Sequence, residues 1–73
     1  MAVKSIHSDE YQELIARLIK ARKSKKLTQE QVAEKLDKPQ SYIAKYEKCE
    51  RRLDVIELKA ICKIIGIKFQ DIV

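Results

Sequence analysis

The stretch from Leu27 to Glu47, LTQEQVAEKLDKPQSYIAKYE, contains two short helical patterns separated by a proline break. The first begins at Thr28, whose hydroxyl can accept a hydrogen bond from a backbone N–H, and the Gln31 side chain can reach back to the Thr28 amide. This capping box predicts the start of a helix. Pro39 pushes Lys38 out of the α conformation but fits the first turn of a helix, so a second helix is predicted from about Pro39.

The two helical patterns divide into residues for a core and residues for a surface. Val32, Ala33 and Leu36 continue one apolar face of the first helix, and Ile43 and Tyr46 are spaced to face inward from the second. The residues left on the outer surface of the second helix are Gln40, Ser41, Ala44, Lys45 and Lys48. This helix therefore presents amide, hydroxyl and cationic groups.

Length and composition restrict the chain to one small all-α domain. A chain of 73 residues buries only about 60% of the surface that its unfolded form exposes. With 45% hydrophobic and 37% charged residues, one Gly and one Pro, it is too apolar for a disordered tail and too poor in turn residues for a β-sandwich. The formal charge of +5 suits an anionic partner such as nucleic acid, but it also occurs in ordinary soluble domains.

The first third of the chain is predicted to hold an arm and one amphipathic helix. Residues 1–8 show no sustained period and are expected to form a flexible N-terminal arm, which leaves residues 9–73 as the domain. Ser8 or Asp9 can cap a helix that runs to about Lys23. Between Arg17 and Lys26 this region has six cations and no acid, which indicates either solvated surface or an edge that faces phosphates.

The last third of the chain is strongly apolar. Asp54 and Glu57 form a second capping box. The helix that follows has an apolar surface wider than one stripe, which predicts a central buried element made by Ile56, Leu58, Ile61, Cys62, Ile64 and Ile65. Gly66 suits a left-handed residue at its end. A short fifth helical turn follows, whose apolar residues either close the core or contact a second copy: Ile67, Phe69, Ile72 and Val73.

Cysteine and histidine positions argue against a metal site. Cys49 and Cys62 form no CxxC pair, and the only histidine, His7, lies in the expected arm; a disulfide is disfavoured. The chain also lacks a Gly-rich phosphate loop and a convergent carboxylate group, so we expect no enzyme, no cofactor and no small-molecule substrate. It has no signal-peptide pattern and no apolar run of roughly 18 residues, which predicts a cytoplasmic protein without membrane contact.

Three segments together resemble a known family. LTQEQVAEKL, PQSYIAKYE and ERRLDVIELKAICKIIGI are similar to the helix-turn-helix region of phage repressor and Cro-type proteins, the Xre type, and the resemblance extends from about Leu14 to Val73. It implies a five-helix lambda-repressor-like domain with the helix-turn-helix at helices 2 and 3. The function implied is a sequence-specific regulator of transcription that binds double-stranded DNA with helix 3 in the major groove.

A second function is compatible with the same resemblance. The alternative is a protein-interaction module that uses this fold to bind a toxin or a polymerase. Salt distinguishes the two functions, because DNA binding through several phosphates weakens steeply as salt rises, whereas a protein contact need not.

The resemblance also implies roles for individual residues. Gln40 suits bidentate contact with adenine, Ser41 can contact several bases, and Lys45 can reach guanine or phosphate. The implied base readers are Gln40, Ser41, Ala44 and Lys45. Alternatively, Gln40 and Ser41 are only capping residues at the N-terminus of the helix. The candidate contacts to the DNA backbone are Gln29, Tyr42, Arg22, Lys23, Lys48 and Arg51.

Two residues depart from the family pattern, which usually carries glycine at their positions. Asp37 tolerates the left-handed conformation. At Cys49 either the backbone is strained or the helix ends with a different geometry, and an exposed thiol there leaves a redox role open. Because one small domain reads few bases, we expect a symmetric dimer on a palindromic operator, with half-sites roughly 34 Å apart. The expected dimer interface consists of Ile67, Phe69, Ile72 and Val73.

Overall fold

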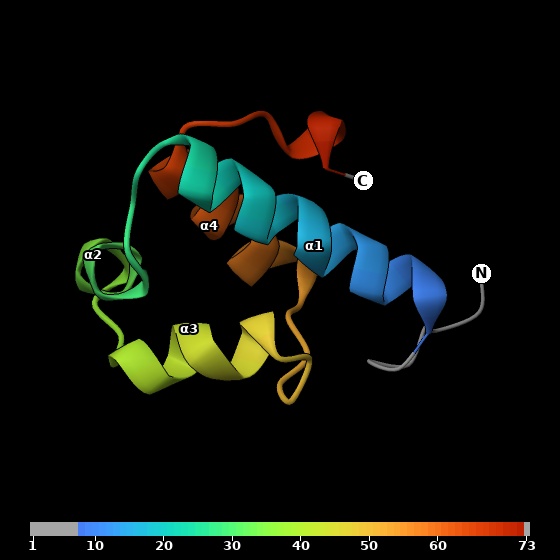
Figure 1. Cartoon of the computed structure of the whole chain (residues 1–73), viewed down its shortest axis with the longest axis horizontal. Coiled ribbons are helices and arrows are strands. Elements are labelled where there is room, and N and C mark those ends of the chain that lie inside the picture. The colour runs from blue at the N-terminus through green and yellow to red at the C-terminus, as the bar shows by residue number, and fades with distance from the viewer. Residues whose placement is uncertain (1–7, 73) are drawn as a thin grey trace.

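A computed structural model describes residues 8–72, which form four α-helices and one short 3-10 helix (Figure 1). The elements are α1 (Asp9–Ser24), α2 (Gln29–Leu36), α3 (Gln40–Glu47), α4 (Val55–Ile65) and η1 (Phe69–Asp71). In Figure 1 α4 lies behind α1, α3 runs below them, and α2 is seen end-on at the left. No strand occurs in residues 8–72, which confirms the predicted all-α class.

The expected fifth helix is not confirmed. The described part of the chain has four α-helices, and η1 is a single turn in which Asp71 N donates to Lys68 O and Ile72 N donates to Phe69 O, both at 3.0 Å. Such bonds between residues three apart give the 3-10 geometry, which rarely runs beyond three or four residues. The predicted arm with His7 lies outside the described residues except for Ser8, and so does Val73.

Three of the helices start at caps that the sequence predicts. Ser8 caps α1. The Thr28 hydroxyl accepts from Gln31 N at 3.0 Å, while Thr28 N donates to Gln31 Oε1 at 2.8 Å. Asp54 and Glu57 repeat this arrangement at the start of α4, with bonds of 2.7 and 3.0 Å. Each reciprocal pair satisfies two backbone N–H groups that have no partner within their own helix.

All four α-helices end in the same way. Each is followed by a residue with positive φ: Lys26 (59°), Asp37 (58°), Cys49 (58°) and Gly66 (88°). The next residue then donates its N–H to a carbonyl five positions back: Leu27 to Arg22, Lys38 to Ala33, Glu50 to Lys45 and Ile67 to Cys62. This motif normally favours glycine, because a left-handed conformation costs other residues roughly 1–2 kcal/mol. Asp37 therefore keeps the predicted turn geometry, and Cys49 adopts the strained one.

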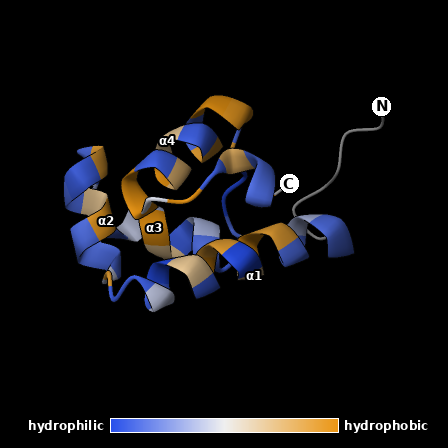
Figure 2. Ribbon diagram, turned by 90° about the horizontal axis from the view of Figure 1, so that it is seen from above, coloured by the Kyte–Doolittle hydropathy of each residue, from blue (hydrophilic) through white to orange (hydrophobic). Residues whose placement is uncertain are grey.

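One apolar core lies between the helices, where their hydrophobic faces meet (Figure 2). Its buried members are Ile15, Leu18, Val32, Ala33, Ile43, Tyr46, Leu53, Leu58, Ile61, Cys62, Ile65 and Ile72. The predicted inward residues of α2 and α3 are therefore in the core, except that Leu36 is half-buried. The prediction that Ile56 is buried is wrong, because 70% of this residue is exposed. None of the described helices is long and apolar enough to cross a membrane.

Candidate nucleic-acid interface

The outer face of α3 carries the predicted base readers. Gln40, Ser41 and Lys45 are exposed and Ala44 is half-buried. Residues four apart lie side by side on a helix, so Gln40 and Ala44 form one row and Ser41 and Lys45 the next. On the inner face Ile43 and Tyr46 are completely buried. The core thus fixes α3 with these polar groups turned outward.

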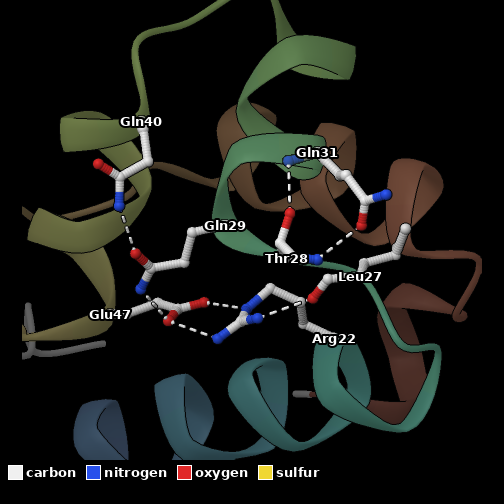
Figure 3. A network of polar contacts seen from close by, with 7 residues as sticks. All are labelled: Arg22, Leu27, Thr28, Gln29, Gln31, Gln40 and Glu47. Carbon is white, nitrogen blue, oxygen red and sulfur yellow. Dashed lines mark hydrogen bonds and ion pairs between the residues drawn. The ribbon is translucent and has the colours of Figure 1, made fainter.

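The starts of α2 and α3 are joined by two glutamines. Gln40 Nε2 donates to Gln29 Oε1 at 2.6 Å, and Gln29 Nε2 donates to Glu47 Oε1 at 2.7 Å (Figure 3). Gln29 is half-buried and Gln40 is exposed. The predicted phosphate-contacting glutamine and the predicted adenine reader therefore touch each other directly.

Arg22 occupies an interior position behind these glutamines. Its guanidinium donates from Nε to Glu47 Oε2 at 2.7 Å, from Nη2 to Glu47 Oε1 at 3.1 Å and from Nη1 to Leu27 O at 2.7 Å (Figure 3). Arg22 is 8% exposed. The side chain is buried and three of its N–H groups bond within the protein, which argues against the predicted phosphate contact of Arg22.

Glu47 was not predicted from the sequence to be part of the site. Its partner Arg22 lies 25 residues away on α1, so the ion pair cannot be predicted from a local sequence spacing. The signal that was present is weak: Glu47 is an acid at the end of α3, where a cation is usually preferred.

A second polar cluster joins α3 to the start of α4. The Tyr42 hydroxyl donates to Glu57 Oε2 at 2.5 Å, and Arg51 Nη2 donates to the same oxygen at 2.9 Å. The Arg51 guanidinium also lies over the Tyr42 ring, 4.8 Å from its centroid, and Lys38 Nζ lies 5.5 Å from it. The cluster holds the predicted backbone contacts Tyr42 and Arg51 together, but it occupies the Tyr42 hydroxyl.

The pKa values of this cluster follow from its hydrogen bonds. The Tyr42 hydroxyl and the Asp54 N–H donate to Glu57 and lower its pKa to about 2, with a further contribution from Arg51. Burial, together with donation to Glu57, raises the pKa of Tyr42 to about 12. At neutral pH Glu57 is therefore ionised and Tyr42 keeps its proton.

The basic C-terminal end of α1 lies close to the starts of α2 and α3. Lys23 and Lys26 are exposed, and they line one hollow together with Thr28, Gln29 and Gln40. The hollow also lies at the N-terminus of α2, where backbone N–H groups without a partner in the helix favour anions. Lys23, predicted to contact phosphate, thus lies beside the starts of both α2 and α3.

The expected dimer residues are only partly accessible. Ile72 is 4% exposed and belongs to the core, whereas Ile67 and Phe69 are half-buried. Phe69 has Lys59 Nζ 5.5 Å from its ring centroid. Val73, the fourth expected residue, lies outside the described residues.

The first turn of α4 carries an exposed apolar pair that was not predicted from the sequence. Val55 is 53% and Ile56 70% exposed, and Figure 2 shows hydrophobic colour at this outer end of the helix. The capping box at Asp54 fixes where the helix starts but not which of its apolar residues face the core. With Leu58, Ile61, Cys62 and Ile65 inward, Ile56 falls outside the buried stripe, whereas Val55, seven residues before Cys62, lies at its edge.

In the described residues the cysteines and acids are not grouped into a metal site. Cys62 is buried in the core, where burial raises the pKa of its thiol, and Cys49 is half-buried in the turn after α3. Within residues 8–72 no three His, Cys, Asp or Glu side chains are grouped so that they could hold a metal ion.

Comparison with known proteins agrees with this arrangement. The sequence pattern of the helix-turn-helix family matches residues 18–72. A solved structure described as an XRE-family like protein from Pseudomonas syringae pv. tomato str. DC3000 is 42% identical, with a TM-score of 0.87 over 92% of this chain and 82% of that chain. No curated protein gives a significant match. The chain belongs to the Xre-type helix-turn-helix family of DNA-binding regulators.

Proposed function

We propose that this chain is a sequence-specific regulator of transcription that binds double-stranded DNA with α3 in the major groove. The observation that carries the proposal is the outer face of α3, where Gln40, Ser41 and Lys45 are exposed over a buried Ile43 and Tyr46. The major groove admits an α-helix, and its base edges offer the hydrogen-bond partners that these side chains need.

Each proposed base reader has a distinct chemical role. The Gln40 amide pairs with the N6 donor and N7 acceptor of adenine, and the Ser41 hydroxyl can donate or accept. Lys45 donates to guanine O6 and N7 or to a phosphate, and the Ala44 methyl group contacts a thymine methyl. Affinity would come mainly from the phosphates, which carry no sequence information directly.

The proposed contacts to the DNA backbone flank α3 on both sides. Lys23 and Gln29 lie at the hollow beside the start of α2. Lys48 follows α3, and Arg51 is held beside Tyr42 by Glu57. Three of these residues are cations, so two copies of the chain would neutralise about six phosphates and give a slope of log affinity against log salt of roughly −5.

We propose that the active form is a symmetric dimer on a palindromic operator. Two copies place two recognition helices about one turn of DNA apart, which one domain cannot do. Ile67, Phe69 and Val73 remain proposed interface residues, and the exposed Val55 and Ile56 add apolar surface one helical turn from Lys59, which contacts Phe69.

The experiment that tests this proposal is selection of bound sequences from random double-stranded DNA at two stated salt concentrations. We expect a palindromic motif and a steep loss of affinity at the higher salt. Recovery of no motif would contradict sequence-specific binding. Binding that hardly changes with salt would instead favour the protein-interaction alternative.

A further inference from the structure

Four side chains form one continuous chain of hydrogen bonds from the interior to the outer face of α3. It runs from Arg22 to Glu47, then to Gln29 and finally to Gln40, with every donor-to-acceptor distance between 2.6 and 3.1 Å (Figure 3). The inner members are nearly inaccessible, since the side chains of Arg22 and Glu47 are 9% and 7% exposed. The outer end, Gln40, is exposed.

The chemistry of the inner pair determines the direction of the whole chain. Arginine can only donate and an ionised carboxylate can only accept, so the ion pair leaves Glu47 as a fixed acceptor. Gln29 must therefore turn its NH₂ group to Glu47, and its carbonyl oxygen then faces Gln40. Because that oxygen can only accept, Gln40 must turn its own NH₂ group inward.

We propose that Glu47 is a positioning residue for base reading, which acts through Gln29 to fix the orientation of the Gln40 amide. The inference rests on the proposed function, since it requires Gln40 to read a base. Arg22 holds the Glu47 carboxylate in place through two hydrogen bonds, and Glu47 itself touches no DNA.

A fixed amide matters because a glutamine amide has two orientations that differ chemically. With one N–H bonded to Gln29, Gln40 keeps one N–H and its carbonyl oxygen for the base. Adenine requires that donor and that acceptor, in one order along its edge, and a flipped amide would set oxygen against the N7 acceptor. The chain of bonds excludes the flipped state before DNA arrives, so less side-chain freedom is lost on binding.

The test measures binding of the whole protein to its selected site and to variants at each base position, first for wild type and Gln40→Ala. Glu47→Gln introduces an amide that can present either end to Gln29. We expect it to reduce the preference at the position read by Gln40 by about tenfold and to leave preferences elsewhere unchanged. In a Gln40→Ala background, Glu47→Gln should cause no further loss of preference there, because the two changes act on one contact.

Gln29→Leu provides a second variant if Glu47→Gln does not fold. It leaves the bonds between Arg22 and Glu47 intact and removes the amide that joins Glu47 to Gln40, so the same position should lose its preference. Loss of the proposed phosphate contact of Gln29 should add a uniform loss of affinity for all sequences, which does not change relative preferences. Glu34→Gln is the matched control, because it makes the same charge change at an exposed site of α2 and should leave every preference unchanged.

The outcomes separate this inference from the function on which it rests. If Glu47→Gln and Gln29→Leu leave the preference at every position unchanged while Gln40→Ala relaxes one position, the inference is wrong and base reading by Gln40 stands. If Gln40→Ala changes no preference at any position, both are overturned. Relaxation of the same single position by all three variants supports the positioning role.

Discussion

The Tyr42 hydroxyl donates a hydrogen bond of 2.5 Å to Glu57 Oε2, which ties the recognition helix α3 to the first turn of α4. Glu57 also accepts from Arg51 and from the Asp54 N–H, so one carboxylate caps a helix, holds a cation and anchors a tyrosine. These contacts lower the pKa of Glu57 to about 2.

The lowered pKa predicts a loss of stability in acid. The unfolded-state pKa of glutamate is about 4.3, so ionised Glu57 stabilises the folded state fully above that pH and progressively less as the pH falls toward 2. We expect Glu57→Gln to lower the free energy of unfolding at pH 7 by about 1–2 kcal/mol, after allowance for screening by solvent, and to match wild type near pH 2. Urea denaturation across this pH range measures it, with Glu50→Gln as the control outside the cluster.

Tyr46 and Tyr42 predict opposite effects of the same substitution. The Tyr46 hydroxyl is buried and has no hydrogen-bond partner in the described part of the chain, whereas the Tyr42 hydroxyl donates to Glu57. Removing an unsatisfied buried hydroxyl should help, because such a group costs about 1–3 kcal/mol. We expect Tyr46→Phe to raise the free energy of unfolding by about 1 kcal/mol and Tyr42→Phe to lower it. A destabilised Tyr46→Phe, measured by denaturant midpoint, would show that the hydroxyl is satisfied.

The left-handed residue after α1 predicts a stabilising glycine. Lys26 has φ of 59° and is exposed, while Lys25 beside it has φ of −87°. Lys26→Gly relieves the left-handed strain and should raise the free energy of unfolding by about 0.5–1 kcal/mol. Lys25→Gly removes the same charge without relieving strain, so it should give no gain. Equal thermal midpoints for the two variants would show that the left-handed backbone at Lys26 is not strained.

Base readers and phosphate contacts should respond differently to alanine. Gln40→Ala should cost about 1–3 kcal/mol on the cognate site and relax the preference at one position. Lys23→Ala should weaken binding to all sequences alike and make the salt slope shallower by about 1 per copy. Fluorescence anisotropy titrations at several salt concentrations separate the two effects. Unchanged selectivity of the Gln40→Ala variant would show that Gln40 does not read a base.

The proposed dimer predicts a loss of self-association on charge insertion. Ile56 is 70% exposed, so Ile56→Asp should leave the fold intact and disrupt an apolar contact between copies. Phe69→Asp should weaken the dimer, and operator binding with it, but Phe69 also packs against the core and stability must be measured in parallel. Sedimentation equilibrium measures the self-association of both variants, and denaturant unfolding measures the stability of Phe69→Asp. If neither variant changes the apparent mass, the dimer does not use this surface.

Local features of the fold could be predicted from sequence because their partners are close along the chain. The Thr28 and Gln31 box and the Asp54 and Glu57 box each join residues three apart, and both form. Asp37 and Gly66 also adopt the left-handed turns expected of them. The outer face of α3 follows from the spacing of Ile43 and Tyr46, so the exposure of Gln40, Ser41 and Lys45 was predictable too.

Features that depend on distant partners were not predictable in this way. Within the cation run of α1, Arg22 is indistinguishable from its neighbours, and only the folded chain brings it to Glu47, 25 residues away. Ile56 was assigned to the core because α4 is apolar over a wide surface, and only packing decides which part faces inward. Lys26 gave no sign of a left-handed turn, since lysine has no preference for one.

The chain of hydrogen bonds behind Gln40 has a consequence for protein engineering. Its members come from α1, α2 and both ends of α3, so a transplant of the outward residues of α3 into another domain would transfer side chains without their orientation. A chimera meant to keep this base preference would also need counterparts of Arg22, Gln29 and Glu47 in its host. The portable unit is therefore a three-helix framework, larger than the recognition helix it supports.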